Sequence, residues 1–222
     1  MSDSETSTET SLVSVGPHRL EGILRRPADP VGLVIFAHGA GSSHRSPRNN
    51  HVAEALAGRR IATLLFDLLT EAEAGDRANV FDIPLLSRRL IEAVDWAAQR
   101  PDLAALPVGL FGASTGAAAA LVAAGAAPGR FAAVVSRGGR PDLAGAVLPA
   151  VRAPVLLIVG GHDEVVIDLN AAAARRLACP HRTEIVPGAT HLFEEPGTLD
   201  RVVQLAGDWF ATHFAGGGES VG

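Results

Sequence analysis

The sequence of 222 residues contains no lysine, no tyrosine and a single cysteine, Cys179. One cysteine excludes an internal disulfide bond and a metal site built from several cysteines. All 19 basic residues are arginines, they form no basic run, and the formal charge is −5, which argues against nucleic acid as a partner. No apolar run is long enough to span a membrane, and residues 1–11 lack the apolar core of a signal peptide. We therefore expect a cytoplasmic protein without a membrane or nucleic-acid partner.

The composition that remains is typical of one globular domain. Hydrophobic residues make up 47% of the chain and charged residues 19%, so a chain of this length can bury a large core. The first residues are rich in Ser, Thr and Glu, and the last are rich in Gly. We expect a domain at residues 12–214, a disordered tail at residues 1–11 and a flexible tail at residues 215–222.

Short apolar runs alternate with longer amphipathic segments from residue 31 onward. Such alternation predicts a doubly wound, mostly parallel α/β sheet with helices on both faces. A hairpin over residues 12–15 and 19–24 precedes it, and residues 70–78 are predicted as an acidic, exposed loop. Fewer than twenty residues, 137–154, stand where a lid could be inserted, so we expect a minimal lid. The predicted strands are 31–37, 61–66, 108–111, 131–135, 155–159 and 182–186, and the predicted helices are 47–57, 84–99, the segment after the elbow to 127, 167–178 and 199–214.

A G-x-S-x-G motif stands between the predicted strand at 108–111 and the helix that follows. It reads Gly112-Ala-Ser-Thr-Gly116, with Ser114 at its centre. This motif in this context is typical of a nucleophile elbow, in which a sharp turn lifts the serine hydroxyl above the sheet edge. Glycines two residues before and after the serine avoid a collision of side chains in the turn. We therefore predict that Ser114 is a nucleophile.

An acid and a histidine follow two later predicted strands. Asp163 comes just after residues 155–159, and His191 comes just after residues 182–186. The carboxyl ends of parallel strands meet at one sheet edge, so both residues should lie near Ser114. The order serine, acid, histidine is typical of an α/β hydrolase, with the histidine as acid and base and the aspartate orienting it. Glu164 could replace Asp163 in that role.

The loop His38-Gly-Ala-Gly41 follows the predicted strand at 31–37. Its glycines permit a close approach of the backbone, so we predict an oxyanion hole from the N–H groups of Thr115 and Ala40. Arg137 follows another strand on the same edge and could bind a substrate carboxylate or phosphate. The alternative is a solvated loop arginine. The histidines show no pattern of metal ligands, so no metal site is predicted.

Four motifs together resemble α/β hydrolases of the dienelactone hydrolase type. They are residues 38–41, 112–116, Gly161-His-Asp163 and Gly188-Ala-Thr-His191, and the resemblance covers roughly residues 12–214. Dienelactone hydrolases carry a cysteine nucleophile, whereas this sequence has Ser114. The resemblance implies an α/β-hydrolase fold and hydrolysis of an ester, lactone or other acyl bond of a small molecule, without a cofactor.

Two other functions are compatible with the same motifs. A non-catalytic α/β-hydrolase fold can serve as a binding module, although such proteins usually lose a member of the triad. An acyltransferase could use the same three residues and pass the acyl group to an acceptor other than water.

Overall fold

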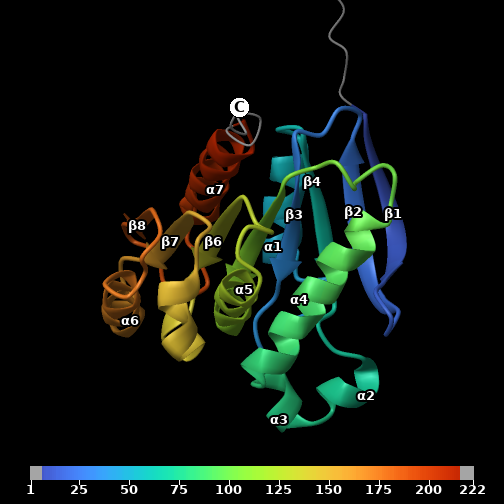
Figure 1. The fold of residues 1–222 in the computed structure, drawn as a ribbon. Coiled ribbons are helices and arrows are strands. Elements are labelled where there is room, and N and C mark those ends of the chain that lie inside the picture. Colours follow the sequence, from blue (N-terminus) through green and yellow to red (C-terminus); the bar gives the residue numbers. More distant parts are fainter. Residues whose placement is uncertain (1–6, 216–222) are drawn as a thin grey trace, which may run out of the picture.

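The computed structural model describes residues 7–215. Within them, one eight-stranded sheet has the order β1-β2-β4-β3-β5-β6-β7-β8 (Figure 1). β1 and β2 are antiparallel to their neighbours, and all other pairs are parallel. The strands are β1 (Thr8–Val15), β2 (Leu20–Pro27), β3 (Gly32–Ala37), β4 (Ile61–Phe66), β5 (Val108–Ala113), β6 (Ala133–Arg137), β7 (Val155–Gly160) and β8 (His181–Val186).

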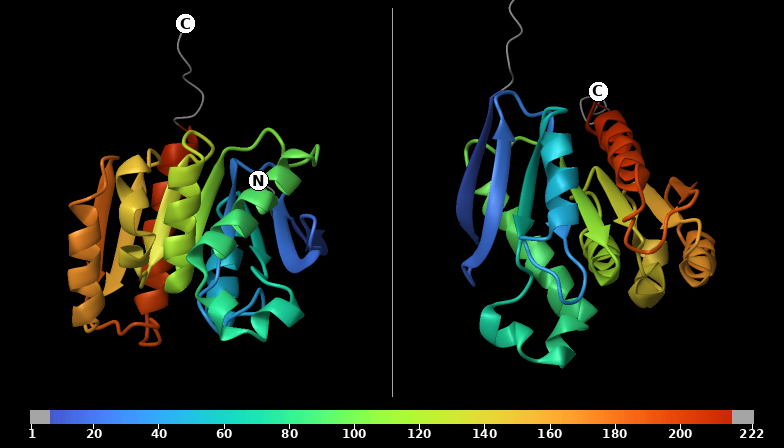
Figure 2. Two further views of the ribbon diagram at one scale, coloured as in Figure 1. Left: turned by 60° about the horizontal axis from the view of Figure 1, so that its bottom comes forward. Right: turned by 180° about the vertical axis from the view of Figure 1, so that it is seen from behind.

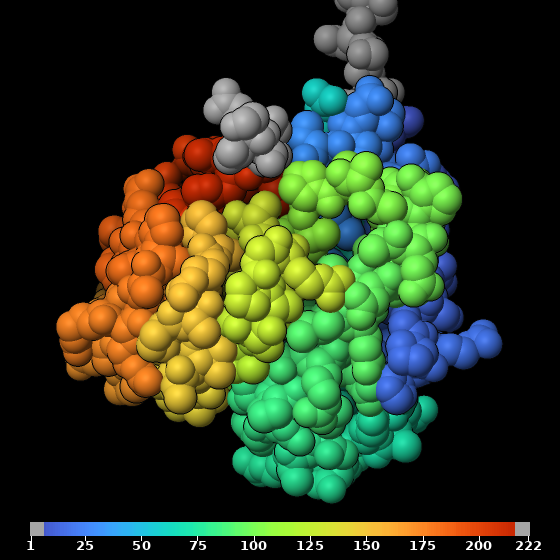
Figure 3. All heavy atoms as spheres, in the orientation of Figure 1, coloured from blue at the N-terminus to red at the C-terminus, as the bar shows by residue number. Residues whose placement is uncertain are grey.

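Helices cover both faces of this sheet, as the two turned views show (Figure 2). α1 and α7 pack on one face, and α4, α5, α6 and a 3₁₀ segment, η1, pack on the other. In the space-filling view the second group hides most of its face of the sheet (Figure 3). The helical elements are α1 (Pro47–Ala57), α2 (Glu71–Ala74), α3 (Arg77–Val80), α4 (Ile83–Ala98), α5 (Thr115–Ala126), η1 (Pro141–Ala150), α6 (Glu164–Ala174) and α7 (Thr198–Ala215).

The predicted α/β-hydrolase sheet is confirmed, and burial explains why its strands were visible in the sequence. Every residue of β3, β4 and β7 is buried, because helices lie on both faces of these strands. Strands buried on both faces form continuous apolar runs instead of alternating patterns. No helix of residues 7–215 is both long enough and apolar enough to cross a membrane.

Two predictions about the N-terminal half differ from the structure. β1 begins at Thr8, so residues 8–11 of the expected tail pair with residues 24–27 of β2, while residues 1–6 lie outside the described range. The expected loop at 70–78 contains α2 and α3. The reason is a capping box, in which the Thr70 hydroxyl accepts from the Glu73 N–H and the Glu73 carboxylate accepts from the Thr70 N–H.

The segment expected to form a minimal lid packs against the body of the protein. η1 buries Ala144 and Leu148 against the cluster that contains α5, and it is kinked at Gly145, where φ is +51°. η1 rests on α5 and α6 and does not cover the carboxyl edge of the sheet. The elements that rise beside this edge are α2 and α3, at the bottom of Figure 1.

Candidate active site

Ser114 occupies a strained turn between β5 and α5. Its φ is +52° and its ψ is −122°, a conformation that costs a non-glycine residue about 1–3 kcal/mol. The end of β6 and the residues just after it hold this turn by two backbone hydrogen bonds. The Ser114 N–H donates to the Arg137 carbonyl at 3.2 Å, and the Arg140 N–H donates to the Ser114 carbonyl at 3.1 Å. The backbone around Ser114 is therefore clamped in the geometry of a nucleophile elbow.

The two glycines of the motif are required by close contacts. A Cβ on Gly112 would overlap the backbone of Ala117, and a Cβ on Gly116 would overlap the Ala37 carbonyl at the end of β3. Gly39 approaches from the loop after β3, where an added Cβ would lie 3.1 Å from the Ser114 Cβ. The elbow thus brings β5, α5 and the loop after β3 together at one point.

His191 and Asp163 meet at the same edge of the sheet. The His191 Nδ1 lies 2.6 Å from the Asp163 Oδ2, and the two side chains are 38% and 16% exposed. A proton on Nδ1 that donates to this carboxylate leaves Nε2 free to accept another. Glu164, the alternative acid, is exposed in the first turn of α6. Among the described residues, no hydrogen bond joins the Ser114 hydroxyl to the His191 ring. In enzymes, such catalytic hydrogen bonds often form only when substrate binds.

The two residues predicted for an oxyanion hole are adjacent. The Ala40 N–H donates to the Thr115 hydroxyl at 2.9 Å, across 75 residues of sequence. This contact fixes the loop after β3 against the first residue of α5. In the structure the Ala40 N–H is therefore engaged by the hydroxyl, and an oxyanion would have to displace that oxygen.

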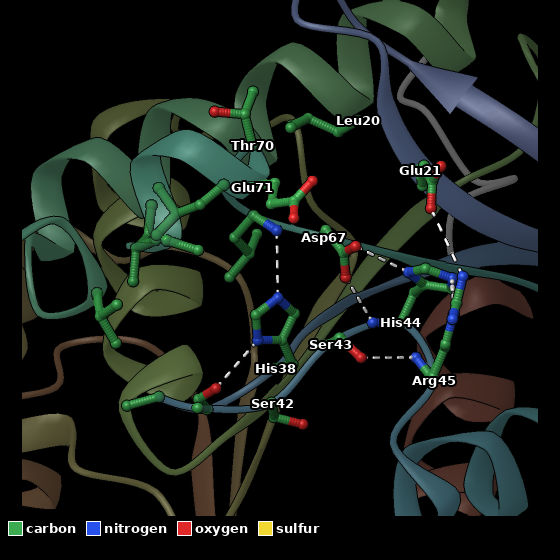
Figure 4. A pocket seen from close by; sticks show the side chains of 18 of the residues that line it. Leu20, Glu21, His38, Ser42, Ser43, His44, Arg45, Asp67, Thr70 and Glu71 are labelled. Atoms are coloured by element: carbon green, nitrogen blue, oxygen red, sulfur yellow. Dashed lines mark hydrogen bonds and ion pairs between the residues drawn. The ribbon is translucent and has the colours of Figure 1, made fainter. Parts of the chain in front are cut away.

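His38 ties this loop to the loop after β4. Its Nε2 accepts from the Leu68 N–H at 3.1 Å, so Nδ1 carries the proton and donates to the Gly39 carbonyl at 3.0 Å (Figure 4). Burial lowers the pKa of His38 below its ordinary value. His38 is thus a neutral hydrogen-bonding residue that joins the loops after β3 and β4.

Arg137 is the last residue of β6, whereas the sequence predicted that it follows a strand ending at residue 135. Its side chain is 7% exposed, and its Nη2 donates to the Asn49 Oδ1 of α1 at 3.2 Å. Burial, assisted by the charge of Arg48, lowers the pKa of Arg137 to about 10, so the group is still charged at neutral pH. The guanidinium thus lies beneath α1. The predicted contact between Arg137 and a substrate anion stays a prediction.

A hollow of about 730 Å³ borders the loop that holds Gly39 and Ala40. Cavities of this volume accommodate small organic molecules. Its remaining walls come from the turn between β1 and β2, the loop after β4, and the α2–α3 segment (Figure 4). The walls combine apolar and polar side chains, among them Leu20, Glu21, His44, Arg45, Asp67, Leu68, Thr70 and Leu86.

Glu21, His44 and Asp67 come together at this hollow with ligand atoms within 4.8 Å of one another. In the structure both nitrogens of the His44 ring are engaged. Nδ1 lies 2.9 Å from the Asp67 Oδ2, and Nε2 accepts from the Arg45 Nε at 3.3 Å. A metal ion on Nδ1 would displace that proton to Nε2, where it would face the Arg45 N–H. The arrangement therefore fits a hydrogen-bond network better than a metal centre.

The chain belongs to the family described as the alpha/beta hydrolase domain, which matches residues 30–204. A dienelactone hydrolase from Anabaena variabilis is 52% identical to it, with a TM-score of 0.88 over 93% of this chain and 98% of that chain. Est1E from Butyrivibrio proteoclasticus shares the fold at 16% identity, with a TM-score of 0.77 over 93% of this chain and 99% of that one. The chain is therefore an α/β-hydrolase-family domain that is similar to a dienelactone hydrolase.

A second relative carries a different name. A protein of Mycobacterium tuberculosis that is provisionally named a phosphoribosyl transferase is 56% identical over 212 residues. The match covers 96% of this chain and 48% of that protein. The chain thus spans about half the length of this relative.

The lowered pKa of His38 predicts that the stability of the protein depends on pH. Because its pKa is lowered in the folded state, the unfolded chain takes up the proton first as the pH falls below the ordinary value of about 6.5. Stability contributed by the neutral ring is present above that value and is lost as the pH falls toward the folded pKa. The unfolding free energy of the wild type should therefore fall more steeply between about pH 7.5 and about pH 5 than that of His38→Gln, measured by urea denaturation. Equal pH dependence of the unfolding free energy in wild type and His38→Gln would contradict a lowered pKa of His38.

Proposed function

We propose that the protein is a serine hydrolase that cleaves an ester, lactone or other acyl bond of a small molecule. The observation that carries the proposal is the strained, clamped Ser114 at the same sheet edge as the His191–Asp163 pair. A strained backbone conformation of a non-glycine residue persists where the surrounding structure enforces it, and it is frequent at active sites. The likeness to dienelactone hydrolase supports acyl chemistry.

The proposed reaction proceeds through an acyl-enzyme. Ser114 Oγ forms a bond to the acyl carbon while its proton passes to Nε2 of His191, and the carbonyl electrons move to oxygen. The oxyanion then collapses, the bond to the leaving group breaks, and His191 returns the proton to that group. A water molecule repeats the sequence on the acyl-enzyme, with His191 as base, and releases the acid and Ser114. Asp163 holds the ring and stabilises its positive charge.

The N–H groups of Ala40 and Thr115 are proposed to bind the oxyanion. The contact between Ala40 N–H and the Thr115 hydroxyl supports this, because an acceptor oxygen already lies at 2.9 Å from the first donor. When substrate binds, its carbonyl oxygen takes the place of that hydroxyl. The donor is thus held near its working position before substrate arrives, which is the arrangement that makes such sites effective.

The name of the mycobacterial relative raises phosphoribosyl transfer as another candidate. We assign that activity to the half of the relative that this chain does not match, because this chain itself matches the hydrolase family and carries the proposed triad. We accordingly expect no release of pyrophosphate when the chain is given a phosphoribosyl diphosphate donor. Transfer of the acyl group to an alcohol uses the same triad, and an excess of product ester over acid when an alcohol is added would reveal it.

Ser114→Ala tests the proposed function. The substitution removes the nucleophile and keeps the motif glycines, so turnover of short-chain esters should fall by about 10³-fold or more, with loss of labelling by a fluorophosphonate probe. Circular dichroism serves as the control for folding. A well-folded wild type that is neither labelled nor active would instead favour a non-catalytic binding module.

We propose that the hollow beside the oxyanion loop receives the acyl part of the substrate. Ala74 of α2 is exposed at its wall, whereas Ala72 of the same helix is exposed and does not line it. Ala74→Trp should raise KM for esters with long or ring-bearing acyl groups about tenfold, because the new ring fills part of the hollow. Acetyl esters should be unaffected in this variant.

Ala72→Trp is the matched control, and it should leave KM unchanged across the series. A rise of KM confined to esters with bulky alcohol groups in Ala74→Trp would place the leaving group in the hollow instead. Equal effects of the two substitutions would show that the hollow does not take up substrate.

A further inference from the structure

Three arginines are buried among the described residues, and only two of them have acidic partners. Arg89 pairs with Glu73 at 2.7 Å and with Glu92 at 3.1 Å. Arg25 pairs with Glu54 at 3.0 Å. The third, Arg137, forms no ion pair with a described residue, and its Nε and Nη1 have no hydrogen-bond partner there. Its one side-chain partner is the neutral amide of Asn49.

The neighbouring charge that acts on Arg137 has the same sign. Arg48 in the first turn of α1 opposes the positive charge of Arg137, while Arg48 itself pairs with Glu194 at 2.7 Å. A buried ion without a counter-ion is strongly unfavourable for folding. Stability alone therefore gives no reason to keep a cation at this position.

The position of Arg137 supplies a functional reason. Its carbonyl accepts from the Ser114 N–H, and its side chain reaches Asn49, three residues into the helix that follows the oxyanion loop. The next residue, Gly138, lies against the His191 loop, where an added Cβ would be 3.0 Å from the His191 carbonyl. Arg137 thus stands where the segments proposed to carry the nucleophile, the oxyanion hole and the base meet.

We propose that Arg137 is a cation kept buried beneath α1, in the strand whose end contacts the Ser114 turn, because its charge stabilises the negative charge that develops on the substrate carbonyl oxygen. The proposal rests on the proposed function and replaces the predicted contact with a substrate anion, since the guanidinium acts through its field and touches no substrate atom. Buried charges act strongly because little water screens them, and a fixed charge requires no reorganisation during the reaction. Arg137 is therefore a positioning charge whose effect is on turnover of neutral and acidic esters alike.

The test compares Arg137→Met with Arg89→Met. Methionine approximates the length of the arginine stem without its charge. Arg137→Met should lower kcat for neutral and acidic esters roughly tenfold to a hundredfold while Tm stays the same or rises, because an unpaired buried charge has been removed. Arg89→Met should leave kcat unchanged and lower Tm by about 5 °C or more, because two carboxylates lose their partner. Arg25→Met serves as the second paired control if Arg89→Met does not fold.

Two further variants separate charge from packing. Arg137→Lys keeps the charge and should retain most of kcat, whereas Asn49→Ala keeps the guanidinium and should lower kcat less than Arg137→Met does. A Tm that falls in Arg137→Met as far as in Arg89→Met would overturn the proposal. So would a kcat within about twofold of wild type, a loss confined to acidic esters, or an equal loss in Asn49→Ala.

The rate of fluorophosphonate labelling distinguishes failure of this proposal from failure of the proposed function. A reactive wild type whose Arg137→Met variant is labelled at the same rate overturns the role of Arg137 and leaves the hydrolase assignment intact. An unreactive, folded wild type overturns both, because no reaction remains for the charge to assist.

Discussion

The backbone conformation of Ser114 is the constraint on which the arrangement of this sheet edge depends. A φ of +52° on a residue with a side chain is unfavourable, and it is maintained by two backbone hydrogen bonds, one to Arg137 at the end of β6 and one from Arg140 just after it. The turn also requires α5 to begin against the end of β3, which only a glycine at position 116 permits. The strain is thus compensated by contacts from β3, β6 and α5. A side chain at position 116 would disturb these contacts and alter the direction of the Ser114 side chain.

Two histidines at this edge have different surroundings, and we propose different roles for them. His38 is partly buried and its two nitrogens are occupied by backbone groups, so it remains neutral and holds two loops together. His191 is 38% exposed and has one carboxylate partner, which leaves its second nitrogen available for proton transfer. Their roles follow from burial and hydrogen bonding, since the residue type is the same.

Much of the fold could be predicted because buried strands form continuous apolar runs and amphipathic helices leave periodic patterns. The elbow, Asp163 and His191 were also visible, since their places at strand ends imply that they meet. The α2–α3 segment was missed although Thr70 and Glu73 form a capping box, because its short helices bury no side chain and leave no apolar stripe. The burial of Arg137 could not be predicted from the sequence, because it depends on how α1 lies over the end of β6. The hollow and the engagement of Ala40 by the Thr115 hydroxyl likewise depend on contacts between distant segments.

The central claim is that Ser114 becomes acylated during turnover, and rapid-quench mass spectrometry tests it most directly. The wild type would be mixed with a short-chain p-nitrophenyl ester, quenched in acid before the steady state, and digested. The account predicts a transient mass increase equal to the acyl group on the peptide that contains Ser114, formed at the rate of the p-nitrophenol burst. Turnover without an adduct, or with a kinetically competent adduct on a different residue, would contradict it.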